Sequence, residues 1–83
     1  VACDNQDEID YFWSKLTEGG GQPGPCGWLK DKFGVSWQVF PAAVPKMLMD
    51  PDRSKAARVM NAFMKMKKFD LAAVERAYAG EAA

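Results

Sequence analysis

The first 40 residues change between strand-like and helix-like hydrophobic patterns. Val1–Cys3 is a short apolar run that suits a strand already under way, so we expect that a further segment preceded it. Polar residues follow, and Asn5 is expected to cap a helix whose Glu8 side chain reaches back to the cap N–H. The predicted helix spans about residues 6–18, and its apolar face carries Ile9, Phe12, Trp13 and Leu16.

The stretch EGGGQPGPCG, residues 18–27, ends this helix because it is rich in glycine and proline. We interpret it as a loop with at most a short edge strand. It lacks the G-K-[ST] of a phosphate-binding loop and the strand and helix that flank a dinucleotide fingerprint. The pattern therefore argues against a Rossmann-like site for a nucleotide or a methyl donor.

Residues 26–40, CGWLKDKFGVSWQVF, predict a hairpin with strands at 27–30 and 35–40 around a turn at 31–34. The apolar face of the second strand is expected to be packed; it consists of Val35, Trp37 and Val39. The other face carries Ser36, Gln38 and Phe40. A buried amide without partners costs about 1–3 kcal/mol. Gln38 is therefore expected to face water, a buried partner or a cavity that holds a ligand.

From Pro41 the pattern becomes helical. One or two turns in residues 41–50 are expected to bring three apolar residues onto the sheet, namely Val44, Met47 and Leu48. A longer helix is expected to begin with Asp50 as its cap and Pro51 at its first helical position, and to continue to residue 69. Its apolar stripe consists of Ala56, Val59, Met60, Phe63 and Met66, opposite a polar face of Arg58, Asn61, Lys65 and Lys68. Asp70 is expected to cap a last helix that ends at Gly80.

The composition sets limits on function. A chain of 83 residues forms one small domain, and its 11 basic and 11 acidic residues cancel, so we expect neither a nucleic-acid nor a membrane partner. The chain contains no histidine, which removes the commonest metal ligand and general base. The two cysteines lack a C-x-x-C spacing, which favours reduced thiols and a cytoplasmic protein. No apolar run is long enough to span a bilayer.

Several residue groups have both a functional and a structural interpretation, and the structural one is favoured for each. The carboxylates that open the first helix suit capping better than acid catalysis. The methionines suit an irregular core or a subunit interface better than a soft-metal site. The basic residues between Arg53 and Lys68 suit a solvated helix face better than an anion site. Trp28 and Trp37 suit packing, with stacking on a ring-shaped ligand as the alternative.

The order of predicted elements resembles the βαβββ module of the vicinal-oxygen-chelate, or glyoxalase and dioxygenase, superfamily. The final strand of that module often reads D-P-x-G-x-x-x-E with the Glu as a metal ligand, and DKFGVSWQ has Asp31, Gly34 and Gln38 at this spacing. CGWLKDKFGVSWQVFP and DPDRSKAARVMNAFMKMKKFDLAAVERAY resemble the PhnB-like branch more specifically. That branch is often labelled 3-demethylubiquinone-9 3-methyltransferase-like.

The resemblance implies an α+β fold with one βαβββ half-module at residues 1–40. A C-terminal helical extension at residues 41–83 would pack on the sheet or on a neighbouring subunit. A complete domain of this superfamily has two modules that form a cup, so the resemblance implies that a first module is missing or that a homodimer completes the cup. An unpaired sheet edge and the thin core of a short chain also favour pairing.

The resemblance also places Gln38 where the superfamily's enzymes have a glutamate that faces the cup. A neutral amide is a poorer ligand for a divalent cation than a carboxylate, so we expect no metal and no other cofactor. The leading hypothesis is a PhnB-like protein that binds a small organic ligand through Gln38, Ser36 and Trp28. The alternatives are a methyltransferase-like or metal-dependent glyoxalase or dioxygenase enzyme, and a non-catalytic interaction protein. The substrate, the reaction and the register of the hairpin are not determined by the sequence.

Overall fold

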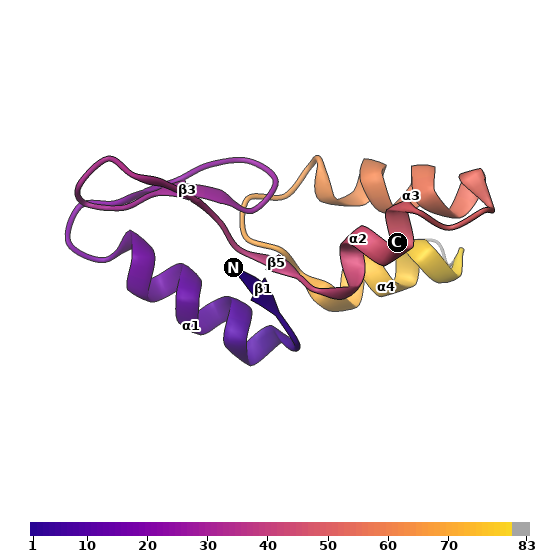
Figure 1. Ribbon diagram of the computed structural model, residues 1–83, viewed down its shortest axis with the longest axis horizontal. Helices are drawn as coiled ribbons and strands as arrows, with labels where there is room; N and C mark the ends of the chain where they lie inside the picture. The colour runs from indigo at the N-terminus through magenta and orange to yellow at the C-terminus, as the bar shows by residue number, and fades with distance from the viewer. Residues whose placement is uncertain (81–83) are drawn as a thin grey trace.

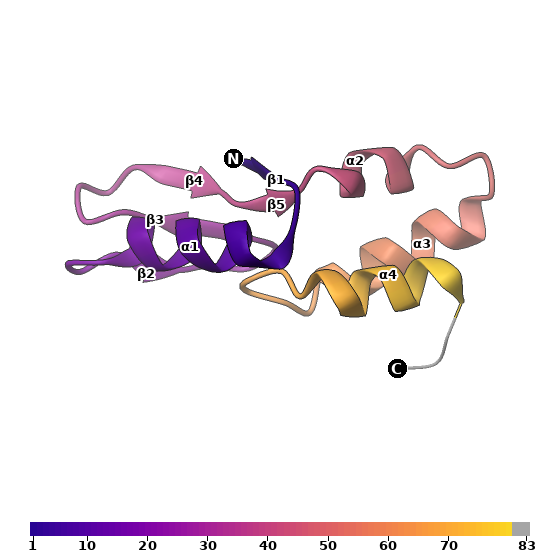
Figure 2. The same ribbon diagram turned by 90° about the horizontal axis from the view of Figure 1, so that it is seen from below.

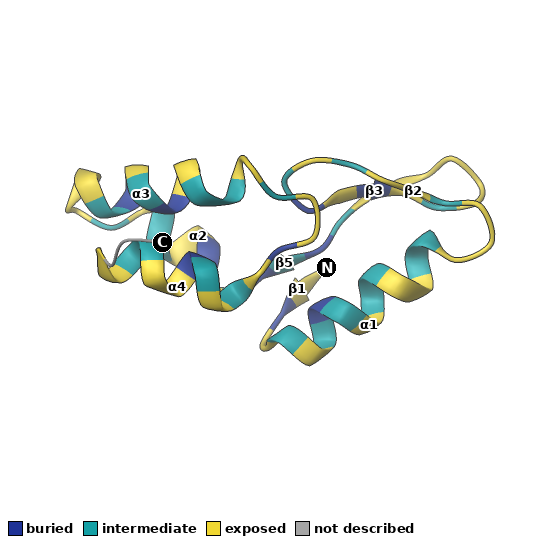
Figure 3. Ribbon diagram, turned by 180° about the vertical axis from the view of Figure 1, so that it is seen from behind, coloured by how far each residue is buried: buried dark blue, intermediate teal, exposed yellow. Residues whose placement is uncertain are grey.

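The computed structural model describes residues 1–80 and shows an elongated α+β molecule of 40 × 21 × 20 Å, which confirms the predicted fold class. Its Cα radius of gyration is 13.1 Å, against about 12 Å for a compact domain of this length. The strands and the first helix form one end of the molecule, and three further helices form the other (Figure 1). Buried residues gather where α1 faces the sheet and where the three helices meet (Figure 3).

The strands are short and belong to two small sheets that share one extended segment. They are β1 (Ala2–Cys3), β2 (Gln22–Pro23), β3 (Trp28–Lys30), β4 (Ser36–Gln38) and β5 (Phe40–Pro41). β2, β3 and β4 pair in an antiparallel order, and β1 pairs with β5 in parallel. Only Val39 separates β4 from β5, and its N–H donates to Gly27 O at 2.9 Å. The strands therefore follow the order β2, β3, β4–β5, β1, and Gly27 continues the ladder of β3.

Helix α1 (Gln6–Thr17) begins where the sequence predicts. Asn5 Oδ1 accepts the N–H of Glu8 at 2.9 Å, as expected of the cap. The Glu8 carboxylate reaches back to the N–H of Asp4 at 2.8 Å and not to that of Asn5, one residue from the expected donor. The helix lies across one face of the sheet (Figures 1 and 2), with Ile9 and Leu29 buried in the core.

Helix α2 (Ala43–Leu48) is followed by α3 (Arg53–Phe63), and the predicted cap of α3 is wrong. Asp52, not Asp50, accepts the N–H groups of the first helical turn. The Asp50 side chain instead accepts the N–H of Asp52 at 2.8 Å, in a local turn that leads the chain to its cap. Pro51 consequently precedes the cap and is not the first helical residue.

The end of α3 is also earlier than predicted, at Phe63 and not at residue 69. Beyond it the chain returns to the sheet, where the carbonyls of Met66 and Lys67 accept hydrogen bonds from the hairpin. The donors are the N–H groups of Cys26, at 2.8 Å, and Gly27, at 2.7 Å. These bonds and the complete burial of the ring of Phe69 outweigh the helix propensity of the segment.

Helix α4 (Leu71–Ala79) follows the predictions. The Asp70 side chain caps it by accepting the N–H of Ala73 at 3.2 Å, and Gly80 ends it with a φ of 83°. The Gln6 side chain joins this helix to the sheet end of the molecule. Its Nε2 donates to Phe69 O at 2.9 Å, and its Oε1 accepts the N–H of Leu71 at 2.8 Å.

The expectation of a packed apolar face on the second hairpin strand is correct only for Val39, which is fully buried. Val35 is 50% exposed and Trp37 is 39% exposed. The Trp37 indole N–H donates to Asp31 Oδ2 at 2.9 Å, which fixes the ring beside the turn.

Candidate functional site

The register of the hairpin determines which side chains share a face. Trp28 lies opposite Gln38, and Lys30 lies opposite Ser36. Side chains alternate along a strand, so these four residues share the face opposite to that of Leu29. Leu29 is buried in the core with α1 on its side of the sheet, so the four residues face away from α1. We call this surface, formed by Trp28, Lys30, Ser36 and Gln38, the open sheet face.

The ladder brings the side chains of the open sheet face close together. Val39 N donates to Gly27 O, and Asp31 N donates to Val35 O, both at 2.9 Å. These two pairs are hydrogen-bonded pairs of the antiparallel ladder, and such pairs alternate with non-hydrogen-bonded ones. The Trp28–Gln38 pair is therefore a non-hydrogen-bonded pair, in which Cα atoms lie about 4.5 Å apart and side chains are closest. The indole ring and the amide are direct neighbours.

The orientation of the Gln38 amide follows from a single backbone contact. Its Nε2 donates to Cys26 O at 3.1 Å, so this nitrogen faces the backbone. Within residues 1–80 no hydrogen bond reaches Gln38 Oε1. The half-buried amide thus has a protein partner and still keeps one acceptor and one N–H for a ligand.

Gln38 also lines an apolar cavity of about 180 Å³ between the sheet and the helices. Gln38 is the one polar residue of the lining, which otherwise consists of Phe40, Val44, Pro45, Leu48, Phe63 and Phe69. The helical end of the molecule therefore supplies most of the wall of this cavity. An apolar lining with a single polar group is the composition of sites for small organic molecules, but this cavity is smaller than the roughly 300–1,000 Å³ of drug-sized sites.

The other two residues predicted for the site do not line that cavity. Ser36 lines a separate one of about 370 Å³, together with Gln22 and Lys30. Trp28 lies on the same sheet face, opposite Gln38, and lines neither of these two cavities. The structure thus places Gln38, Ser36 and Trp28 on one surface but not in one cavity, and their role in binding stays a prediction.

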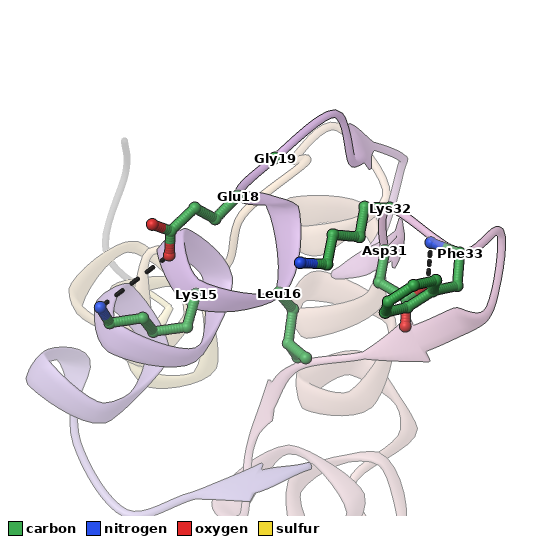
Figure 4. Close-up of a pocket in the computed structure, with 7 residues that line it drawn as sticks. All are labelled: Lys15, Leu16, Glu18, Gly19, Asp31, Lys32 and Phe33. Atoms are coloured by element: carbon green, nitrogen blue, oxygen red, sulfur yellow. Dashed lines mark hydrogen bonds and ion pairs between the residues drawn. The ribbon is translucent and has the colours of Figure 1, made fainter.

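A further cavity, of about 370 Å³, lies between the end of α1 and the hairpin turn (Figure 4). Its two carboxylates already have partners. Glu18 pairs with Lys15 at 3.9 Å, and Asp31 accepts the N–H groups of Phe33 and Val35 at 2.8 and 3.0 Å. The hydrogen bond from the Trp37 indole, and then these backbone N–H groups, hold the pKa of Asp31 below its usual value. Asp31 is therefore a turn-forming residue.

The donor groups of the open sheet face do not fit a divalent metal. Gln38 offers a neutral amide, and its neighbours on the face are an indole, a hydroxyl and the Lys30 ammonium, which repels a cation. In the described chain no three His, Cys, Asp or Glu side chains come together as a metal-binding group. Of the helices within residues 1–80, none is both long and apolar enough to cross a bilayer.

Sequence reasoning missed Lys30 on the open sheet face and Gln22 beside it in β2. The signal for Lys30 was present in the turn, because the four residues from Asp31 to Gly34 determine which residues of β3 and β4 lie opposite each other. Phe40 was placed on the correct face but not in a cavity. The sequence near Phe40 cannot predict this cavity, because residues of α2 and α3 form most of its wall.

Residues 1–40 match the family model described as 3-demethylubiquinone-9 3-methyltransferase. No curated protein matches the chain. The matched segment contains all five strands except the last residue of β5, together with α1 and the open sheet face, and it stops before α2. Over residues 1–40 the chain is therefore similar to the 3-demethylubiquinone-9 3-methyltransferase family.

Proposed function

We propose that the chain binds a small organic molecule on the open sheet face, in a cup that a second copy of the chain completes. The observation that carries the proposal is the direct opposition of Trp28 and Gln38 on a face that α1 does not cover. The indole is 46% exposed and offers a flat apolar surface. The amide beside it keeps free hydrogen-bonding groups at the edge of an apolar cavity.

The second copy is part of the proposal because the sheet has an α1 layer on one face only. Antiparallel sheets such as β2–β3–β4 commonly bury one face and solvate the other with polar side chains. Here the open sheet face carries an exposed tryptophan, and the half-buried Phe40 lines the apolar cavity between this face and α2. Contact with another copy would remove this apolar surface from water and would cover the ligand on the open sheet face.

The family's name denotes methyl transfer, and enzyme activity is the alternative for this chain. Our proposal assigns no cofactor, because the glycine-rich loop lacks the pattern of a nucleotide site and the Gln38 surroundings do not suit a divalent metal. Calorimetry with S-adenosylmethionine and metal analysis of the purified chain test the alternative. Bound metal, or heat of binding that Gln38→Leu removes, would favour an enzyme.

The test of the leading proposal begins with the mass of the chain in solution by light scattering. A screen of small ring compounds then follows the Trp28 indole and Gln38 side-chain amide signals by NMR. We expect a dimer, and ligands that shift both signals in the wild type and bind more weakly to Gln38→Leu. Asn61→Leu removes an exposed amide on α3 and is the matched control. A monomer, or ligands that shift neither signal, would contradict the proposal.

The helical end favours an interaction protein as a second candidate function. Met49 is 80% exposed, and Met60 in α3 and Met64, the residue that follows α3, are also exposed. Leu48 and Met60 line a groove of about 200 Å³ between α2 and α3. Methionine side chains adapt to varied partner surfaces. If this surface holds two copies together, Met60→Glu with Met64→Glu would turn a dimer into a monomer, whereas Trp28→Glu would leave its mass unchanged.

A further inference from the structure

A row of polar side chains crosses three strands next to the Trp28–Gln38 pair. Lys30 in β3 lies opposite Gln22 in β2 on one side and opposite Ser36 in β4 on the other. All three residues are exposed, and all three line the same cavity of about 370 Å³. The row therefore places an ammonium group between an amide and a hydroxyl, all of which donate hydrogen bonds.

Lys30 is the one charged residue of this cavity, whose remaining lining consists of Pro23, Gly24 and Leu29. No carboxylate of residues 1–80 forms an ion pair with it. The acidic residues near the start of α1 belong to the opposite side of the sheet, and the Asp31 carboxylate is held within the hairpin turn. The local field at Lys30 is thus positive although the chain as a whole is neutral.

The spacing to Trp28 suits a ligand with two chemical parts. Trp28 and Lys30 are alternate residues of one strand, so their Cβ atoms lie roughly 7 Å apart on the same face. The ammonium on its four-carbon stem can turn towards the ring or away from it. An aromatic ring on the indole would place an attached anionic group within reach of Lys30 and Ser36.

We propose that the row of Gln22, Lys30 and Ser36 binds the carboxylate of an aromatic acid whose ring lies on Trp28. This inference rests on the proposed function and specifies the class of its ligand. Lys30 supplies the charge, and the Ser36 hydroxyl and the Gln22 amide donate to the carboxylate oxygens. Gln38 contacts the ring substituents from the far side of Trp28.

The test compares three probes by NMR titration of the full chain: benzoate, the neutral isostere benzamide, and acetate, which lacks the ring. We expect benzoate to bind about threefold to fivefold more tightly than benzamide, as suits one solvent-exposed charge contact. Acetate is expected to bind more weakly than both. Lys30→Gln should remove the difference between benzoate and benzamide. Lys32→Gln, which neutralises an exposed lysine of the hairpin turn, should keep it.

The outcomes separate this inference from the proposed function. Equal binding of benzoate and benzamide to the wild type, both dependent on Trp28, would overturn the carboxylate site and leave a neutral ring compound as the ligand. Acetate that binds as tightly as benzoate would overturn the role of Trp28. If no ring compound shifts the signals of Trp28 or Gln38, the proposed function itself fails, and the carboxylate site fails with it.

Discussion

Replacing Gly27 with alanine should destabilise the chain far more than a change of one methyl group suggests. Gly27 is buried and has a φ of 79°, a region that side chains other than glycine rarely adopt. A Cβ atom added there would lie 2.5 Å from Val39 O and 2.6 Å from Cε2 of Phe69. The backbone strain costs about 1 kcal/mol, and overpacking of a filled core adds about 1–3 kcal/mol.

The expected loss of about 2–4 kcal/mol is a large part of the roughly 4–12 kcal/mol by which a chain of this length is stable. Urea denaturation followed by tryptophan fluorescence measures it. Gly34→Ala is the matched control, because Gly34 has a similar φ of 82° but nothing lies within 4 Å of its added Cβ. The control should lose only about 1 kcal/mol. Equal losses in the two variants would refute the argument that the contact with Phe69 matters.

Three further changes test contacts that hold the helices in place. Gln6→Ala should lower the free energy of unfolding by about 1–2 kcal/mol, since it removes side-chain bonds to the N-terminus of α4; a loss no greater than that of an exposed Gln22→Ala would contradict it. Asp52→Ala should lower the free energy of unfolding by about 1 kcal/mol, because it removes the α3 cap. Thermal unfolding measures this loss, and an unchanged stability would indicate that Asp50 is the cap instead. The hydrogen bond from Tyr78 holds the pKa of Asp50 below its usual value. Its contribution is therefore present above the unfolded pKa of about 4 and is lost as the pH falls through the folded value, so Tyr78→Phe should flatten the acid side of a melting-temperature profile; unchanged curvature would count against this coupling.

Local sequence patterns correctly predicted those helix ends that depend on contacts between neighbouring residues. Asn5 and Asp70 cap their helices with their own side chains, and Gly80 ends α4 with a positive φ. These contacts span only a few residues, so composition and spacing predict them. The choice between Asp50 and Asp52 failed because both satisfy the same local pattern and Tyr78, far along the chain, binds one of them.

The end of α3 and the shape of the candidate site depend on distant contacts. Nothing within residues 64–69 opposes a helix strongly, and the segment leaves α3 because the hairpin needs two carbonyl acceptors there. The open sheet face could be predicted from strand alternation, and Gln38 and Ser36 were placed on it correctly. The cavity beside Gln38 could not, because its wall comes from α2, α3 and the ring of Phe69.

The return of residues 64–69 to the hairpin makes the folding of the first 40 residues depend on the rest of the chain. The family match ends at residue 40, yet the buried Gly27 N–H and that of Cys26 find their acceptors at Lys67 and Met66. A fragment cut at the family boundary would leave these donors unpaired and would expose the surface on which Phe69 packs. Any graft or truncation that treats the first 40 residues as an autonomous module should therefore yield an unfolded chain, whereas one that extends through α4 keeps the hairpin and the helices as a single cooperative structure.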